Sequence, residues 1–377
     1  MSTDIKTDWL HNPSPSDLNE LWNRLPGGPV STSFQTPPFL SAMQDVSSCR
    51  NNFCGQFSVL SISLFGSASP TLLLPLTTFS KGPFQVASIP DFGLSDQNGP
   101  VLSRDFFVEL SERKSAEDYN VQRTAILSTL RSSIPNVDVL DIHNIHPQID
   151  GLPNPLFDVA GSTPDGTTNF LEDANLQNTK LEPVRSVYKE TTTKFRKLRE
   201  RGVELVLAET TEDCISICNT ILQQRLEKLK SLSHETEDTH EFQDAFYRRL
   251  ASSDASDNPF KAMALRFEQE IIAAVALMAT GKSITGVLVS MGGDKWHRFS
   301  PGMVLVAKSI ESARENGYRS FCFGIGNQTY KKRFGGAELN RQRLVWSLSL
   351  KGKAYLAGIR TKKMSGDLLR YWPGGIS

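Results

Sequence analysis

Residues 296–336 read WHRFSPGMVLVAKSIESARENGYRSFCFGIGNQTYKKRFGG, and this stretch decides the fold. Its hydrophobic spacing predicts a helix from Gly302 to Glu315, a strand from Tyr318 to Ile325 and a second short helix that begins near Thr329. The dipeptide Asn316-Gly317 ends the first helix, because glycine adopts the left-handed backbone that helix ends often require. The stretch therefore forms the main part of a βαβα unit.

The start of the first helix is the most informative point in this unit. Ser300 is a good N-cap residue, Pro301 suits the first helical position, and Gly302 leaves the next amide uncovered. The helix is therefore expected to open with bare N–H groups, and such a terminus binds phosphate groups.

The strand after this helix ends in glycines. Its two faces alternate, with Phe321, Phe323 and Ile325 on one and Cys322, Gly324 and Gly326 on the other. Two glycines on one face indicate close approach of another backbone or of a ligand, such as an arm that carries amides. The phenol of Tyr330 is expected near the carboxyl end of this strand, where open α/β sheets bind their ligands.

Alternating hydrophobic patterns and turn residues predict the elements around this unit. The expected strands are Val203–Glu209, Met263–Glu270, Ile271–Thr280, Ser283–Met291, Arg343–Leu350 and Ala354–Ile359, and the expected helices are Thr211–Lys230 and Thr239–Leu250.

This order of elements resembles the cofactor half of the GNAT acyltransferase superfamily. Within it, the chain is most similar to acetyltransferases of the cellulose-biosynthesis type, relatives of the Fem-type aminoacyl transferases. The residues that carry this resemblance are Ser33-Phe34-Gln35-Thr36-Pro37, Leu74-Pro75-Leu76, Ser95 to Pro100, the basic helix Lys194 to Arg201, Ser300-Pro301-Gly302, Gly326-Asn327 and Tyr330-Lys331. The sequence departs from the family pattern at Cys322 and Asn327, where the family usually carries acidic residues.

The resemblance implies an α/β (α+β) fold of tandem GNAT-like domains, each a mixed, mostly antiparallel sheet flanked by helices. It also implies acetyl-CoA or another acyl-CoA as co-substrate. The residues that it assigns to the cofactor are Arg298, Ser300, Gly302, Met303, Val304, Gly326 and Lys331, with the pyrophosphate on the amides of residues 302–304.

Catalysis then requires an acid and a base. Tyr330 matches the superfamily tyrosine that protonates the departing thiolate, and Asn327 is expected to hydrogen-bond the pantetheine amide or the thioester carbonyl. For the general base the sequence leaves several residues open. These are Asp294 and His297, in the loop before the cofactor helix, and Glu268 and Glu270, near a strand turn.

Composition limits the function classes. The 377 residues include 41 basic and 41 acidic side chains, so a net charge of zero argues against general binding of DNA or other polyanions. The five cysteines show no zinc-type spacing, and no metal is expected.

The first ten residues have no apolar core of a signal peptide, so a cytoplasmic protein without a membrane span is expected. The apolar stretches Phe57–Leu76 and Ile271–Met291 are interrupted by turn residues and are interpreted as strand pairs.

Two domains are expected from the length. The stretch Gly161–Pro183 is polar and shows no helical or strand period, so we place the boundary near residue 180. Residues 1–180 then form a degenerate GNAT-like domain on the acceptor side, and residues 181–377 form the domain with the CoA site. In the first domain the expected helices are Pro15–Leu25, Pro38–Gln44, Ser103–Ser111 and Asn120–Ser132, and the expected strands are Phe57–Leu64, Thr71–Leu76 and Val137–Ile145.

Several side chains have a second interpretation. Cys322 would be the nucleophile of an acyl-enzyme pathway, although a buried thiol on a central strand is commoner. Cys214 and Cys218 have the spacing of a helix face, and His143 and His146 match no recognised pattern of metal ligands. The basic helix Val187–Arg201 is either a solvated surface or a contact for an anionic acceptor.

The sequence thus predicts an acyl-CoA-dependent N-acyltransferase, acetyl in the first instance, that acts on a small-molecule or saccharide amine in polysaccharide or cell-envelope biosynthesis. Two alternatives stay open. One is an inactive GNAT-like scaffold or binding module of a polysaccharide-synthesis complex, and the other is a Fem-type enzyme that uses charged transfer RNA. The acceptor, the acyl length and the oligomeric state are not defined by the sequence.

Overall fold

The structure is a computed structural model that describes residues 5–48, 55–64, 67–112, 116–172, 184–232, 237–254, 256–326 and 328–364. The chain divides into two compact units, which are described separately. Unit 1 comprises Met1–Gly166 and Asn340–Ser377, and unit 2 comprises Thr167–Leu339. The sequence-based boundary is a single cut near residue 180, whereas these units are divided at two places in the chain.

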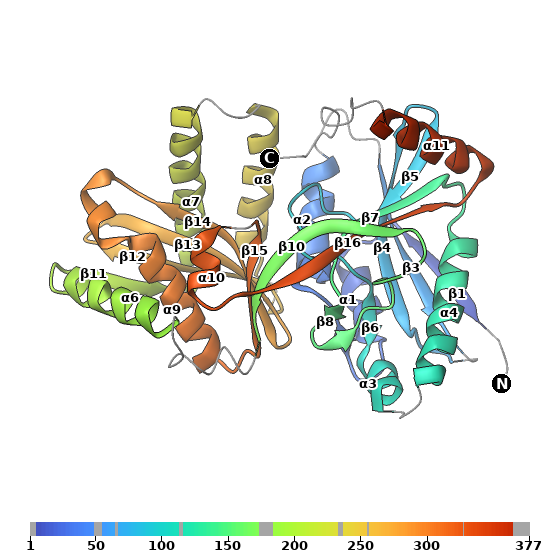
Figure 1. The fold of residues 1–377 in the computed structure, drawn as a ribbon, viewed down its shortest axis with the longest axis horizontal. Helices are drawn as coiled ribbons and strands as arrows, with labels where there is room; N and C mark the ends of the chain where they lie inside the picture. Colours follow the sequence, from blue (N-terminus) through green and yellow to red (C-terminus); the bar gives the residue numbers. More distant parts are fainter. Residues whose placement is uncertain are drawn as a thin grey trace. The chain divides into compact units, whose positions relative to one another are not determined.

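Unit 2 is built on one mixed sheet (Figure 1). Its strands, in spatial order, are β10 (Ser162–Leu171, which enters from unit 1), β15 (Ser320–Ile325), β14 (Ser283–Met291), β13 (Glu270–Thr280), β12 (Phe260–Phe267) and β11 (Val203–Leu207). Only β14 and β15 are parallel, and the other neighbours are antiparallel. The strand pair expected over Ile271–Met291 is thereby confirmed.

Helices cover both faces of this sheet (Figure 1). They are α6 (Val184–Arg199), α7 (Thr211–Leu232), α8 (Glu237–Ala251), α9 (Pro301–Glu315) and α10 (Thr329–Arg333), with a 3₁₀ turn, η2 (Asp294–Phe299), before α9. α7 packs on α8 and on β12 to β14, and α6 packs on α9.

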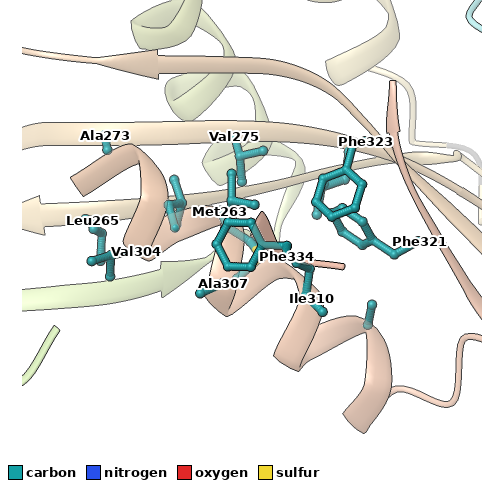
Figure 2. Close-up of a cluster of buried hydrophobic side chains, with 14 of the residues drawn as sticks. Met263, Leu265, Ala273, Val275, Val304, Ala307, Ile310, Phe321, Phe323 and Phe334 are labelled. Atoms are coloured by element: carbon teal, nitrogen blue, oxygen red, sulfur yellow. The ribbon is translucent and has the colours of Figure 1, made fainter. Parts of the chain in front are cut away.

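The core of unit 2 fixes the position of α9. Figure 2 shows its apolar side chains against residues of β12 and β13 and against three phenylalanines from β15 and the end of α10. The labelled residues are Met263, Leu265, Ala273, Val275, Val304, Ala307, Ile310, Phe321, Phe323 and Phe334, all at most 6% exposed. Each large side chain removed from water in this way contributes about 1.5–3 kcal/mol. These contacts hold α9 against the sheet of unit 2, where it packs on β12, β13 and β14.

Unit 1 repeats the strand pattern of unit 2. Its main strands, in spatial order, are β1 (Lys6–His11), β3 (Gln56–Ser63), β4 (Leu72–Lys81), β5 (Phe84–Ser88), β7 (Val139–Ile145) and β16 (Ala337–Ser347). The one parallel pair, β5 with β7, occupies the place that β14 with β15 has in unit 2. The predicted fold class, with mixed, mostly antiparallel sheet structure flanked by helices in each unit, is confirmed.

The remaining elements among the described residues of unit 1 are short strands and six helical segments. They are β2 (Pro29–Val30), β6 (Val101–Ser103), β8 (Gln148–Ile149), β9 (Leu152–Pro153), α1 (Pro15–Asn23), η1 (Ser33–Gln35), α2 (Pro37–Ser48), α3 (Arg104–Glu112), α4 (Ala116–Ser133) and α11 (Leu350–Met364). Side chains of α3 and α4 enter a second core, where Phe107, Ile126 and Leu130 are at most 1% exposed.

Each unit takes its last strand from the other half of the chain. The sixth place of unit 2 is filled by the end of β10, where Thr168 pairs with Ile325 and Leu171 with Phe321. The sixth place of unit 1 is filled by β16, whose Leu344 pairs with Ile142. The two units therefore exchange one strand each.

Two expectations from the sequence were wrong. Ala354–Ile359 is not a strand but lies inside α11, which begins after Ser349, whose hydroxyl accepts from the Gly352 amide at 3.0 Å as a helix cap does. Gly161–Pro183 is not free of strand structure, because it contains β10; Pro164 and Gly166, at φ 90°, interrupt the alternation that would reveal a strand. Residues 173–183 of this stretch lie outside the described residues.

Candidate active site

The parallel strands of unit 2 separate near their carboxyl ends. β14 and β15 pair only at Ser283 with Ser320, Ile284 with Phe321 and Thr285 with Cys322, although β14 continues to Met291. Beyond this point the strand pairing of β14 is with β13 and that of β15 is with β10. The backbone edge of β14 beyond Thr285 is therefore separated from β15, and it faces the place where a ligand that carries amides would lie.

Helix α9 starts where β14 ends, and its first residues differ from expectation. Ser300 does not cap the helix with its side chain; its backbone is left-handed, at φ 47°, and its hydroxyl accepts from Lys194 Nζ at 2.9 Å. The amide of Val304 donates to the Ser300 carbonyl at 3.1 Å and is used within the helix. Of the three amides expected to bind phosphate, those of Gly302 and Met303 lie in the first turn, where no intrahelical acceptor exists.

Gly302 lies close to the side chain at the end of β14. A Cβ on Gly302 would lie 2.9 Å from the sulfur and 3.2 Å from Cγ of Met291, at the end of β14. A side chain at position 302 would therefore have to displace the Met291 side chain from the first turn of α9. Val289 and Met291 are 36% and 44% exposed, and Ile325 at the end of β15 is 38% exposed. The carboxyl ends of both strands thus present apolar side chains.

Cations from three segments surround the start of α9. Arg298 and Arg201 each place the guanidinium carbon within 5 Å of the Phe299 ring centre, at 4.8 and 4.7 Å, and Lys194 contacts Ser300. The sequence pointed to Arg298 alone for this role. The other two belong to the basic run at the end of α6 and just after it, and that charge run was the available signal.

Tyr330 is half-buried on α10, close to the end of β15. Its ring meets Phe323 edge-on at 6.4 Å and packs against the core of unit 2. Burial raises the pKa of the phenol above its ordinary value, so the hydroxyl stays protonated at neutral pH. A neutral phenol in this place is able to donate a proton.

Lys331, the next residue, is buried rather than solvated. It is 1% exposed, and its Nζ donates to the carbonyls of Gly324 at 2.9 Å, Ile325 at 2.8 Å and Gly326 at 3.0 Å. Its ammonium is directed at the strand end instead of at a phosphate. Gly324 and Gly326 have φ of 75° and 100°, so these glycines are needed for the backbone conformation. Asn327 lies outside the described residues.

The candidates for the general base lie on the surface around η2. Asp294 is fully exposed, and His297 is half-exposed with Nδ1 at 3.5 Å from the Asp294 carboxylate. Glu270 pairs with Lys295 at 3.7 Å, and its carboxylate lies 3.9 Å from the Cβ position of Gly293. Glu268, with φ 54°, belongs to the turn between β12 and β13. The structure brings Glu270, Asp294 and His297 to the same loop.

The cysteines of unit 2 are packed in its interior or along a helix. Cys322 on β15 is 1% exposed, and its sulfur accepts from the Gly324 amide at 3.3 Å. Cys218 on α7 is also 1% exposed, and burial raises the pKa of its thiol to about 12. A thiol with so high a pKa holds almost no thiolate at neutral pH, which agrees with the helix-face interpretation of Cys218.

The corresponding place in unit 1 is occupied by the chain itself. β5 and β7 pair at Val86 with Val139 and at Ala87 with Leu140, and then Asn98 takes the place beside β7, with its amide donating to the Asn144 carbonyl at 2.9 Å. The Asn98 side chain accepts from Gln35 at 3.1 Å and from Ser95 at 2.8 Å. The sequence motifs at residues 33–37 and 95–100 thus meet at this place.

Unit 1 also holds a group of charged side chains on β7 and its neighbours. Arg343 binds Asp141 with two hydrogen bonds, of 2.7 and 2.6 Å, and His143 lies 3.4 Å from both Asp141 and Asp165. Among the described residues no group of three His, Cys, Asp or Glu side chains is arranged to hold a metal ion. No helix among them is both long and apolar enough to cross a membrane.

Known proteins share the fold at low sequence identity. Residues 185–332 match the family model described as an acetyltransferase (GNAT) domain. Among solved structures, FemX is 10% identical with a TM-score of 0.55, over 89% of this chain and 96% of that one. The C-terminal domain of a putative lysylphosphatidylglycerol synthetase from Agrobacterium fabrum is 15% identical with a TM-score of 0.51, over 94% and 99%.

L-PGS from Bacillus licheniformis is 11% identical with a TM-score of 0.50, over 95% of this chain and 98% of that one. No curated protein matches the sequence. Residues 185–332 are therefore similar to an acetyltransferase domain, and the chain has a GNAT- and Fem-like fold.

Proposed function

We propose that the protein transfers an acyl group, acetyl in the first instance, from a coenzyme A thioester to the amine of a small molecule or saccharide. The observation that carries this proposal is the separation of β14 from β15 next to the first turn of α9. One place then offers the backbone edge of β14 for the amides of a pantetheine arm and helix amides for a pyrophosphate.

The acyl-CoA donor would be held both at its pyrophosphate and along its pantetheine arm. The amides of Gly302 and Met303, together with Arg298, Lys194 and Arg201, supply positive charge for the pyrophosphate. The exposed apolar side chains at the ends of β14 and β15 cover the aliphatic part of the arm.

The chemistry needs two proton movements. The bound thioester supplies an activated acyl carbon, and transfer forms a carbon–nitrogen bond as the carbon–sulfur bond breaks. Tyr330 would donate its hydroxyl proton to the departing sulfur, because burial keeps the phenol neutral. The proton lost by the amine would pass to His297 or Asp294, and Asn327 would hydrogen-bond the thioester or the arm.

The first test is thermal stabilisation by ligand. CoA or acetyl-CoA is expected to raise the melting temperature, since a ligand at a hundredfold excess over its Kd adds about 2.7 kcal/mol to the folded state. ATP and NAD are expected to give no shift. Gly302→Val should abolish the shift, because the added side chain would occupy the space beside Met291 and the amides of the first turn.

Gly358→Val is the matched control, because a Cβ at that position in α11 meets no atom within 4 Å. It should keep the full shift. A full CoA shift in folded Gly302→Val would contradict the assignment of α9, and stabilisation by charged transfer RNA without any by CoA would favour the Fem-type alternative.

Binding stoichiometry gives an independent test of the same proposal. We expect one equivalent of CoA per chain in isothermal titration calorimetry, because Ser95 to Asn98 occupy the corresponding place in unit 1. Two equivalents would mean that unit 1 also binds the cofactor. One bound equivalent with no turnover on any amine would favour the inactive scaffold.

A further inference from the structure

Helix α10 is too short to hold its own position. It has five residues, and Gln328 before it provides no side-chain cap. An isolated helix of this length is unstable in water, because one or two backbone hydrogen bonds do not offset the cost of ordering the chain. The direction of its side chains, including Tyr330, is therefore set by contacts with the rest of unit 2.

Two of these contacts lie at the surface. Lys332 pairs with Glu338 and Arg333 with Glu190, both at 2.7 Å, and all four side chains are more than one third exposed. Exposed ion pairs contribute at most about 1 kcal/mol each. They are weak restraints on the helix.

Lys331 is a strong restraint, next to the buried ring of Phe334 at the end of α10. A buried ammonium is costly unless hydrogen bonds replace its water, and here three carbonyl oxygens of consecutive residues do so at 2.8 to 3.0 Å. Hydrogen bonds from a charged donor are roughly twice as strong as neutral ones. The three carbonyls converge on one nitrogen because the backbone is left-handed at Gly324 and Gly326. Lys331, Gly324 and Gly326 together attach α10 to the end of β15.

We propose that Lys331 is a positioning residue that holds Tyr330 at the carboxyl end of β15. The two residues are neighbours on α10, so the bonds from Lys331 to β15 fix the place from which the phenol extends. The peptide group is planar and trans, so a carbonyl drawn toward Lys331 turns the amide of the next residue away from it. The Gly326 amide is thus directed away from the lysine. The inference rests on the proposed function only for the role of Tyr330 as acid.

The decisive measurement is the titration of Tyr330 itself. The seven tyrosines are labelled with carbon-13 at the phenol carbon, and Tyr330→Phe assigns the resonance by NMR. In Lys331→Met we expect the pKa of Tyr330 to fall back toward the ordinary value of 10.0, since the phenol leaves its half-buried place against Phe323. Lys332→Met removes a neighbouring lysine at the surface and should leave the titration unchanged.

Loss of the buried cation can impair folding, so Lys331→Gln, which keeps two N–H donors without the charge, is measured in parallel. A smaller fall in the pKa of Tyr330 is expected, because two of the donors remain. An unchanged Tyr330 titration in either folded variant would overturn the proposal.

Turnover supplies a second readout. Lys331→Met should lower kcat about a hundredfold, the cost of a misplacement of about 1 Å, and leave the KM for acetyl-CoA within a few-fold. In the Tyr330→Phe background the same change should cost little more, because coupled residues are not additive. If the double variant lost kcat by the product of the two single losses, Lys331 would not act through Tyr330. A wild type that shows no CoA shift would instead refute the proposed function, while the NMR result would still test the coupling.

Discussion

Tyr330→Phe is expected to lower kcat about a hundredfold and to leave CoA affinity within a few-fold, because one positioned general acid contributes about that much to the rate. Phenylalanine keeps the ring contact with Phe323, so the fold should be unaffected. The rate is measured as release of the CoA thiol from acetyl-CoA, with glucosamine and with water as acceptors, and the affinity by the CoA thermal shift.

Tyr318→Phe is the matched control, because Tyr318 also packs against the core of unit 2 and burial also raises the pKa of its phenol. It should retain wild-type turnover. If both variants were equally active, the thiolate would take its proton from another source and Tyr330 would be a packing residue only.

The second large effect is a loss of stability in acid that depends on His146. This side chain in unit 1 is 3% exposed, Nε2 lies 3.2 Å from the Asp96 carbonyl, and burial lowers its pKa from 6.5 to about 4. Between these two values the unfolded chain binds a proton that the folded chain does not. The contribution of His146 to stability is therefore complete above pH 6.5 and is lost as the pH falls to about 4.

The size of this loss follows from the shift in pKa, at 1.36 kcal/mol per unit, and is about 3 kcal/mol. Urea unfolding of the wild type and of His146→Gln at pH 7.5 and pH 4 measures it, since glutamine keeps an N–H donor but does not titrate. The wild type should lose about 3 kcal/mol more than the variant. An equal acid loss in both would show that His146 is not held neutral by the fold.

The sequence predicted those elements whose signals are local. Ser283–Met291 is a strand as expected, and the helix expected from Gly302 to Glu315 begins one residue earlier. Prediction failed for elements whose structure depends on residues far away in the chain. β10 carries a proline and a glycine that interrupt its pattern, and α11 contains an apolar run that is typical of a strand.

The candidate site divides in the same way. Tyr330 and Gly302 were named as candidates from the order of elements and from the start of a helix, both of which are local, and their roles stay predictions. The burial of Lys331 and the contact of Lys194 with Ser300 were not predicted, because each joins segments that only the folded chain brings together. In the sequence, Lys331 looks like any other member of the run Lys331-Lys332-Arg333.

The exchange of β10 and β16 has a consequence for how the chain is made. Synthesis proceeds from the amino terminus, so the first five strands of unit 1 leave the ribosome long before β16, which completes their sheet through pairs such as Trp346 with Leu140. Until then β7 has an unpaired edge, and such an edge invites pairing with another chain. A fragment that starts near Leu181 would leave β15 in the same condition, without Thr168 to Leu171 beside it. Chaperone dependence and aggregation of truncated chains are therefore properties to expect of this protein during its biosynthesis.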